Sequence, residues 1–416
     1  MTDTNLSLTR RDKTAKGCPA SRRAIFSLLQ HIQGAGLTVH DPQLGTQFFG
    51  DAGASLQAKM VVQHARTYRR ALLGGTIAAA ESYMDGDWDT PDLTALLLTL
   101  ANNIRVADRL ESRMSWLTTP LNQLIHALRR NNVRQAKRNI AAHYDLGNDF
   151  YTTFLDQAML YSSGWFRQPE MTLEQAQQEK MQRLCDRLAL GPQDHLLEIG
   201  SGWGAMAEYA ARQYGCRVTT TTISREQFEY CRQRIAAAGL SDRVTVLCED
   251  YRHLNGQYDK IVSIEMIEAV GKAYIPLFIR CCQQLLKPGG RMALQAITIS
   301  EERFSSYARG VDFIQRYIFP GGFLPSVSLL NDTLKAVSDF SVVDQFEMGE
   351  DYARTLQCWR QRFDHAWPQL AQGRFDERFR RMWLFYLCYC EAGFRARTID
   401  TVQLTLQRHE PLALQP

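Results

Sequence analysis

The sequence lacks the features that would place the chain in a membrane or outside the cell. Its longest apolar runs, residues 95–101 and 382–390, are much shorter than the roughly 20 apolar residues of a membrane-spanning helix. The first residues carry charge but no apolar stretch before a small-residue cleavage site, so we expect no secretory signal. The 10 cysteines form no CxxC pair, which favours reduced thiols and argues against a structural zinc site. We therefore expect a cytoplasmic protein without a bound metal.

A large excess of charge is also missing, because 48 Lys and Arg against 44 Asp and Glu give a net charge of +4. With 45% hydrophobic and 22% charged residues, the composition is typical of a globular protein. The positive charge is nevertheless concentrated between Arg105 and Arg138. With Trp116 and Leu117 nearby, this stretch predicts either a membrane-docking surface or a solvated linker helix. No RNA-binding motif accompanies it, so we expect no nucleic-acid partner.

The pattern of apolar residues divides the chain into two parts. Residues 1–125 have mostly helical apolar spacing and predict a small helical N-terminal domain. Within it, a helix is expected to end before an acidic turn at Asp85-Gly86-Asp87, and Asp92 is expected to cap the next helix. In residues 126–416, short β-branched runs alternate with amphipathic stretches, which predicts an α/β fold with a doubly wound, mostly parallel sheet. The expected strands are 195–199, 216–221, 243–248, 259–265 and 291–299, with a turn at 287–290 and helices at 204–214 and 225–238.

A glycine loop, GSGWG, follows the first of these strands and would approach a ligand. Gly200, Gly202 and Gly204 have G-x-G-x-G spacing, whereas the dinucleotide fingerprint is G-x-G-x-x-G. Glu198 lies inside the strand end, where a carboxylate would attract an ammonium group and repel a phosphate. The loop therefore favours S-adenosylmethionine over a dinucleotide, although a glycine turn that only packs helix on strand stays an alternative.

The next two strands end in polar residues that face the same edge of the expected sheet. Thr222 and Gln227 follow the second strand and are candidates for the ribose side of a cofactor. Asp250, after the third strand, could meet an adenine amine, and either group could instead be plain loop.

Five stretches resemble the cyclopropane-fatty-acid synthases and the related mycolic acid cyclopropane synthases, which are S-adenosylmethionine-dependent methyltransferases. They are HYDLGNDFYTTFLDQAMLYSSGWF, LLEIGSGWG, EMIEAVG, FIQRYIFPGGFLPS and EAGFRAR, in the family's order. The resemblance covers nearly the whole chain and is specific from about residue 143 onward. It implies a seven-stranded Rossmann-like sheet and a reaction on unsaturated acyl chains of phospholipids.

The resemblance also implies roles for individual residues. For cofactor binding they are Tyr161, Ser162, Glu198, Gly200, Gly202, Thr222, Gln227, Asp250 and Tyr251. For a bicarbonate ion that acts as the base they are Ser163, Glu268, Gln295, Ile297 and Tyr317. Three neighbourhoods depart from the family pattern, because Ser163 replaces a cysteine, Gln295 replaces a histidine and Ala269 replaces the histidine of a Glu-His pair. Serine and glutamine still donate hydrogen bonds to an anion, so an ion site is still expected, but the base and its pH dependence are open.

The chemistry requires a dry site, because an alkene is a weak nucleophile and the carbocation formed on methylation would be trapped by water. We expect Glu268 to orient the base and the aromatic rings of Tyr317, Phe319 and Trp165 to stabilise the cation. The structural alternatives are a helix-capping Glu268 and an interior Tyr317.

Two further segments carry residues of interest. Cys390 matches a cysteine assigned as a nucleophile in related enzymes, but its apolar surroundings favour core packing. His143 and Tyr144 open the HYDLGNDFY segment; we expect His143 to be a structural residue, and Asp145 and Asp149 to cap or turn the segment.

Three functions follow from the sequence. The first is formation of cyclopropane rings on phospholipid acyl chains, by a protein associated peripherally with the inner membrane. The second is a methyltransferase that leaves a methyl or methylene branch on the same lipids, motivated by Ser163 and Gln295. The third is a catalytically silent lipid-binding protein. Bacterial relatives suggest a homodimer.

Overall fold

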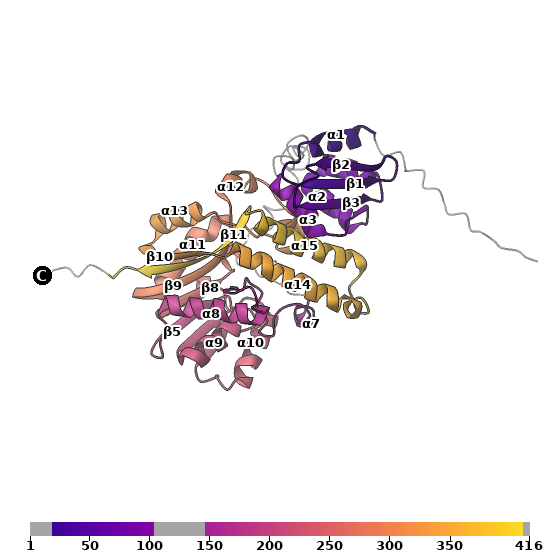
Figure 1. Cartoon of the computed structure of the whole chain (residues 1–416). Helices are drawn as coiled ribbons and strands as arrows, with labels where there is room; N and C mark the ends of the chain where they lie inside the picture. Colours follow the sequence, from indigo (N-terminus) through magenta and orange to yellow (C-terminus); the bar gives the residue numbers. More distant parts are fainter. Residues whose placement is uncertain (1–18, 104–145, 411–416) are drawn as a thin grey trace, which may run out of the picture. The chain divides into compact units, whose positions relative to one another are not determined.

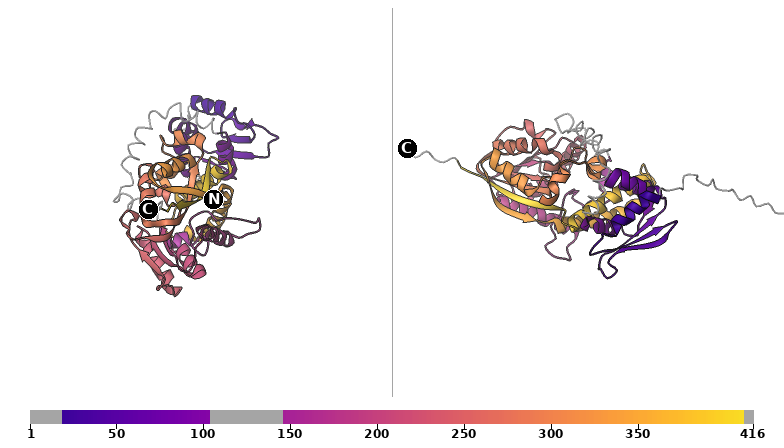
Figure 2. Two further views of the ribbon diagram at one scale, coloured as in Figure 1. Left: turned by 90° about the vertical axis from the view of Figure 1, so that its left-hand side faces the viewer. Right: turned by 90° about the horizontal axis from the view of Figure 1, so that it is seen from above.

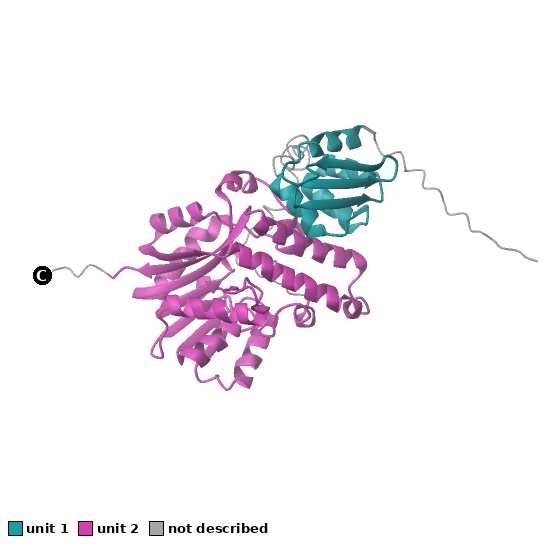
Figure 3. Ribbon diagram, in the orientation of Figure 1, with its two compact units in different colours: residues 1–118 teal, residues 119–416 magenta. Residues whose placement is uncertain are grey.

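The computed structural model describes residues 19–103 and 146–410, which form two compact units divided between residues 118 and 119 (Figure 3). Each unit is described by itself. The division lies among the residues outside the described ranges, so the domain boundary expected at residues 125–126 stays a prediction.

The first unit is not the helical domain that the sequence predicts, because it contains a four-stranded sheet with the order β2-β1-β3-β4. In β1, the buried residues Leu37 and Val39 alternate with the partly exposed residues Thr38 and His40. The apolar residues therefore repeat every 2 positions, and not every 3.6 as in a helix. Gly34 precedes this strand, and Gly36 is its first residue. The elements are α1 (Pro19–Leu29), β1 (Gly36–Asp41), β2 (Gly45–Gly50), β3 (Gln57–Val62), α2 (Arg66–Met84), β4 (Trp88–Asp89) and α3 (Leu93–Asn102).

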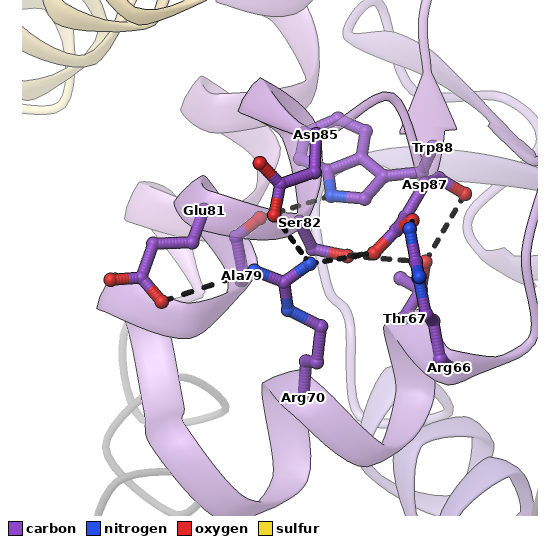
Figure 4. A network of polar contacts seen from close by, with 9 residues as sticks. All are labelled: Arg66, Thr67, Arg70, Ala79, Glu81, Ser82, Asp85, Asp87 and Trp88. Carbon is purple, nitrogen blue, oxygen red and sulfur yellow. Dashed lines mark hydrogen bonds and ion pairs between the residues drawn. The ribbon is translucent and has the colours of Figure 1, made fainter.

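The acidic turn between α2 and α3 is confirmed, with the short strand β4 inside it. The Asp92 carboxylate accepts a hydrogen bond of 2.9 Å from the Ala95 backbone N–H and caps α3, as the sequence predicts. The Asp87 carboxylate is fully buried and accepts hydrogen bonds from Arg66, Arg70 and Ser82 (Figure 4). This buried network ties the turn to both ends of α2.

The second unit has a seven-stranded sheet with the order β10-β11-β9-β8-β5-β6-β7, in which the last five strands run parallel. β11 pairs antiparallel with both β9 and β10, so the sheet is mostly parallel, as expected. Residues 287–290 form no separate turn: they lie within β9, where its pairing with β8 is irregular. The strands are β5 (His195–Ile199), β6 (Arg217–Thr221), β7 (Val244–Leu247), β8 (Tyr258–Ile264), β9 (Leu286–Ile299), β10 (Phe340–Glu347) and β11 (Ile399–Arg408).

Helices cover both faces of this sheet and bury a separate apolar core on each (Figures 1 and 2). One core contains Phe278 and Leu330 from α11 (Ile275–Leu285) and α13 (Val327–Val337). The other contains Leu184, Met206 and Ile235 from three helices. These are α8 (Leu173–Leu188), α9 (Ala205–Tyr214) and α10 (Arg225–Ala237). The sheet is therefore doubly wound, as predicted.

Two long helices, α14 (Gly349–Leu370) and α15 (Glu377–Arg395), lie side by side and contact β11 (Figure 1). The apolar run at residues 382–390 belongs to α15. Among residues 19–103 and 146–410, no helix is long and apolar enough to cross a membrane. The remaining elements include α7 (Asn148–Tyr151), α12 (Glu301–Tyr307), the short 3₁₀ turns Tyr251–His253, Ile267–Ala269 and Lys272–Tyr274, and the π-helix Ile314–Ile318.

Candidate active site

The glycine loop after β5 has the backbone that its sequence requires. Gly200, Gly202 and Gly204 have φ values of 99°, 48° and 89°, a region that side chains disfavour. A Cβ at Gly200 would lie 3.2 Å from the Cγ of Met266, so the loop packs directly on the segment after β8. The Trp203 indole N–H donates to the Asn148 side chain at 2.7 Å, which ties the loop to α7.

Glu198 is a buried carboxylate with few partners. It pairs in register with Thr220 of β6, whose hydroxyl donates to Glu198 Oε2 at 2.6 Å. Burial raises the pKa of Glu198 to about 8, because among the described residues no cation forms an ion pair with it and Arg234 acts from farther away. An ammonium group that binds beside Glu198 would restore its charge, so this residue fits the amino acid end of a sulfonium cofactor.

The polar residues after the next two strands are ordered by contacts within their own loops. The Thr222 hydroxyl donates to the Gln227 side-chain carbonyl at 2.8 Å, so the sequence correctly placed the two together. Asp250 was expected to be available for adenine, but both of its oxygens accept from Arg252, at 2.8 and 2.6 Å. Burial alone would raise the pKa of Asp250, but the hydrogen bonds from Arg252 outweigh burial, and the pKa of Asp250 is lowered below its usual value. The Tyr251 ring packs edge-on against Phe278. The adenine contact stays a prediction.

Tyr161 and Ser162 precede Ser163 in a loop that forms hydrogen bonds with residues of α8 and α15. The Tyr161 hydroxyl lies 2.8 Å from the hydroxyl of Tyr386 on α15. The hydroxyl of Ser162 accepts from the Lys180 ammonium at 2.6 Å. Lys180 is fully buried, and this desolvation lowers its pKa to about 8. The loop therefore rests on a buried cation.

Glu265, a residue that the sequence analysis did not single out, takes the hydrogen bonds expected for a bound anion. Its Oε1 accepts from the Ser163 backbone N–H at 2.9 Å and from the Gln295 side-chain amide at 2.7 Å. Its Oε2 accepts from the Tyr352 hydroxyl at 2.7 Å. Burial raises the pKa of Glu265, which these three bonds and the nearby charge of Lys180 oppose. Ser163 and Gln295 thus converge as predicted, but they converge on a side chain.

Glu268 lies one turn beyond Glu265, and its two oxygens have different surroundings. Oε1 accepts a short hydrogen bond from the Ile297 backbone N–H, which confirms the expected proximity of these two residues. Oε2 is buried and has no hydrogen-bond partner among the described residues. Burial first, and then the charge of Glu265, raise the pKa of Glu268 to about 8. At neutral pH this carboxyl therefore holds a proton, and it forms no helix cap with its side chain.

The segment with Tyr317 and Phe319 approaches Glu268 from the other side. The Phe323 backbone N–H donates to the Glu268 carbonyl at 2.9 Å, so the loop after Phe319 rests on the Glu268 turn. The Phe319 ring lies 6.3 Å from the ring of Tyr161, and Tyr317 packs against Phe313. The expectation for Trp165 is not supported, since its ring faces three other side chains. These are Phe346, Arg167 and Arg183.

Cys390 lies on α15, and its role as a nucleophile gains no support. Burial raises the pKa of its thiol, which therefore stays protonated. Asp149 lies in the first turn of α7 and pairs with Arg374, but the N-cap residue of α7 is Gly147 and no side chain caps this helix, so the expected capping by Asp149 is not supported. His143, Tyr144, Asp145, Trp116, Leu117 and the basic stretch from Arg105 to Arg138 lie outside the described residues.

Three polar residues of the site were missed, and one of them carried a signal in the sequence. Lys180 stands on the buried stripe of α8 with Leu173, Gln177 and Leu184, where a lysine is out of place unless it has a partner. Gln403 is buried on β11 opposite Gln295 and donates to it at 2.9 Å. Glu265 follows directly after a strand with φ 48°, a backbone angle that the sequence did not reveal.

Comparison with known proteins agrees with this geometry. Residues 131–404 match the family model described as mycolic acid cyclopropane synthetase. The chain belongs to this family. It is thus an S-adenosylmethionine-dependent methyltransferase that modifies lipids.

Relatives within the family are named for different reactions. The chain is 42% identical to a tuberculostearic acid methyltransferase of Mycobacterium tuberculosis, over 82% of this chain and 81% of that protein. It is 36% identical to a cyclopropane-fatty-acyl-phospholipid synthase of Escherichia coli, over 85% of this chain and 89% of that protein. A crystal structure of a mycolic acid cyclopropane synthase complexed with SAH and CTAB matches 65% of this chain and 98% of that chain, with 31% identity and a TM-score of 0.62.

The family resemblance implies two bound groups, S-adenosylmethionine and bicarbonate, and the residues present fit the first. The glycine loop and the buried carboxyl group of Glu198, which has no ion-pair partner among the described residues, fit S-adenosylmethionine. A bicarbonate ion does not fit in the same way. The Ser163 N–H and the Gln295 amide already donate to Glu265, and the Ser163 hydroxyl donates to the Gly164 carbonyl at 2.9 Å. An added anion would also lie beside Glu265 and Glu268. Burial already raises the pKa of both carboxyl groups, so a further negative charge at this place is unfavourable.

Proposed function

We propose that the protein transfers one carbon from S-adenosylmethionine to a cis double bond in an unsaturated acyl chain of a phospholipid. The observation that carries the proposal is the pair of buried acidic groups, Glu265 and Glu268, packed through Met266 against the glycine loop. Methylation of an alkene needs a base in a site that excludes water, because the resulting carbocation must lose a proton without meeting water.

The residues of the chain have distinct roles in this reaction. The cofactor supplies an electrophilic methyl group. Glu198 and the glycine loop hold its amino acid end, and Thr222 with Gln227 face its ribose. The aromatic rings of Tyr161 and Phe319 line the site and favour a cation over water. Tyr317 remains a candidate for this role.

The first product that we propose is a cyclopropane ring. It forms when the base removes a proton from the new methyl group, so that the C–H electron pair closes the ring. The second candidate is a methylene or methyl branch, which requires a different proton to leave first. Glu265 favours the second candidate, because three hydrogen bonds fix its side chain in the place where a mobile bicarbonate ion would act. A fixed base can remove only those substrate hydrogens that lie close to its oxygens. The 42% identity to a protein named as a tuberculostearic acid methyltransferase, and not as a cyclopropane synthase, points the same way.

The decisive experiment uses the purified full chain with S-adenosylmethionine and vesicles of a monounsaturated phospholipid. Mass spectrometry and proton NMR of the released acyl chains then report the product. A gain of one CH₂ with high-field ring protons gives the cyclopropane. The same mass with vinylidene protons gives the methylene branch, and two further hydrogens give the methyl branch, for which a separate reductant is required. No lipid product together with cofactor binding would contradict the proposal and favour a silent lipid-binding protein.

We also propose that the protein docks on the membrane surface, as its substrate requires. The basic stretch from Arg105 to Arg138 with Trp116 and Leu117 is the candidate surface. Sedimentation with anionic and with neutral vesicles tests this, and docking through the basic stretch predicts binding that weakens with added salt. A homodimer stays a proposal that sedimentation of the protein alone would test.

A further inference from the structure

The contacts of Glu265 carry an inference about which group acts as the base. We propose that the Glu265 carboxylate takes the place of a bound bicarbonate ion and is itself the catalytic base of this enzyme. The inference rests on the proposed reaction at an acyl double bond. It assigns to a side chain a role that the family resemblance gives to an ion.

The first argument is the identity of the donors. The family resemblance assigns Ser163 and Gln295 to the bicarbonate ion. Both residues instead donate to one oxygen of a side chain, Glu265 Oε1. They come from a loop and from β9, which are far apart in the sequence, so their convergence on one carboxylate is a property of the fold. A third donor, the Tyr352 hydroxyl from α14, fixes the other oxygen. Three donors hold the carboxylate in one orientation, as a base requires.

The second argument is the location and the backbone of Glu265. Its N–H donates to the Gln295 carbonyl at 2.8 Å, and its φ of 48° turns the chain out of β8 at once. For a residue with a side chain this conformation costs about 1–3 kcal/mol and persists where the surroundings enforce it, often at an active site. The following residue, Met266, packs on Gly200 of the glycine loop. The strained turn therefore places the carboxylate next to the cofactor loop.

The third argument is charge. Lys180 is buried near Glu265 and donates a hydrogen bond to the Ser162 hydroxyl, and its positive charge favours the ionised form of Glu265. Burial raises the pKa of both Glu265 and Glu268, but three donors and the charge of Lys180 oppose this at Glu265, whereas Glu268 Oε2 has no hydrogen-bond partner among the described residues. The ionised form is therefore better supported at Glu265, and a bicarbonate ion would find its donors occupied by that side chain.

The proposed step is balanced within the site. A C–H bond of the methylated, cationic acyl chain breaks, and its proton goes to a Glu265 oxygen. The C–H electron pair forms the new carbon–carbon bond of the ring or the second bond of a methylene group. The product is neutral, Glu265 is left protonated, and the proton later passes to solvent when the site opens.

The test compares the wild-type protein with E265Q and E265G in buffer freed of carbon dioxide and in buffer with added bicarbonate. Glutamine keeps the size of the side chain, and glycine adopts a positive φ readily while opening the space. We expect wild-type turnover to be independent of bicarbonate and E265Q to lose at least about 100-fold in turnover, the range of general-base catalysis. E265G is expected to be slow without bicarbonate and to be partly restored by it. E350Q is the matched control, because Glu350 is exposed and forms an ion pair with the exposed Arg397.

A fall in wild-type turnover when bicarbonate is removed would overturn the inference, as would an E265Q variant within about threefold of wild type. A second readout does not depend on activity. In ¹³C NMR with labelled bicarbonate, we expect no binding to the wild-type protein and binding to E265G, whereas binding to the wild type would contradict the inference. If the wild type makes no lipid product, the proposed function fails, and the binding comparison alone then decides the inference about Glu265.

Discussion

The two units bury acidic side chains in opposite ways. In the first unit, Asp87 is saturated: two arginines and a serine donate to its carboxylate, and its carbonyl accepts from Thr67. In the second unit, Glu198 has one neutral donor and Glu268 has an oxygen without any partner among the described residues. A buried carboxylate with a full set of cationic partners stabilises a fold, whereas one that lacks them is costly and marks a site that awaits a ligand or a proton. This difference predicts which substitutions change stability and which change binding or chemistry.

The largest effect is expected for D87N in the first unit. The substitution removes the charge that pairs with Arg66 and takes one of three ion pairs from Arg70, which is a quarter exposed and keeps its pairs with Glu81 and Asp85. We expect a loss of about 3 kcal/mol in the free energy of unfolding of this unit, measured by denaturant titration and by amide hydrogen exchange of α2. The control is E229Q, whose exposed pair with Arg225 contributes less than about 0.5 kcal/mol. Equal stability of D87N and E229Q would contradict the structural role of the network.

The next effect concerns the cofactor and its dependence on pH. Glu198 has a pKa of about 8 in the free protein, so it is mostly protonated at neutral pH. A cofactor ammonium binds the ionised form, so cofactor binding releases a proton and the affinity should rise with pH up to about 8 and then level off. In E198Q the side chain cannot ionise, and we expect a Kd about 30-fold higher above pH 8 and no such rise, corresponding to the loss of a charged hydrogen bond. Calorimetric titration with S-adenosylhomocysteine at several pH values measures both. An unchanged pH dependence in E198Q would separate Glu198 from the ammonium.

The sequence predicted the cofactor half of the site far better than the base. Gly200, Gly202 and Glu198 were found because their spacing and their place at a strand end directly express what a ligand needs. Glu265 was not found because its role depends on a backbone turn and on donors from three distant segments, which no local pattern encodes. The family resemblance pointed to the correct neighbours, Ser163 and Gln295, but to a different anion.

The fold shows the same division between local and non-local information. The five parallel strands were found from their β-branched runs, whereas β11 was not assigned. On β11 Val402 and Leu404 are buried on one face, but Thr401 and Gln403 are buried on the other, so its polar residues resemble an exposed face in the sequence. The sheet of the first unit was missed because the apolar residues of its strands were interpreted with the helical spacing of the segments that flank them.

E268Q tests whether ionisation of Glu268 disturbs the base. As the pH rises through about 8, Glu268 loses its proton and places a negative charge beside Glu265. We expect wild-type turnover with saturating cofactor to fall in this range, because the like charges repel and displace the base. Glutamine is neutral at every pH, so this alkaline decline should disappear in E268Q. If it remains, the buried Lys180, which also titrates near pH 8, sets it instead.

A smaller effect is expected for Y352F, which removes the donor to Glu265 Oε2. This hydrogen bond favours the ionised carboxylate, so its loss raises the pKa of Glu265 further. The base must be ionised to accept a proton, so the acid limb of the pH profile should move to higher pH. The change in turnover at neutral pH should be about tenfold, the value of one hydrogen bond to a charged group. Y214F is the control, since the Tyr214 hydroxyl donates to Asp186 away from the site. Equal profiles for Y352F and Y214F would show that Tyr352 does not position the base.

The smallest effect is expected for C390A, although Cys390 belongs to the same helix as Tyr386 and matches a cysteine with an assigned chemical role in related enzymes. A nucleophilic thiol needs a lowered pKa, and burial raises the pKa of Cys390 instead. Its neighbours Asp312 and Cys388 reinforce that direction, since neither is a cation. Loss of the sulfur should therefore lower stability by about 1 kcal/mol through lost packing and leave turnover within about threefold. Thermal unfolding and the lipid assay measure the two quantities separately. A loss of turnover as large as that of E265Q, with the fold intact, would restore the thiol as a reacting group and remove the contrast between charged and neutral buried groups.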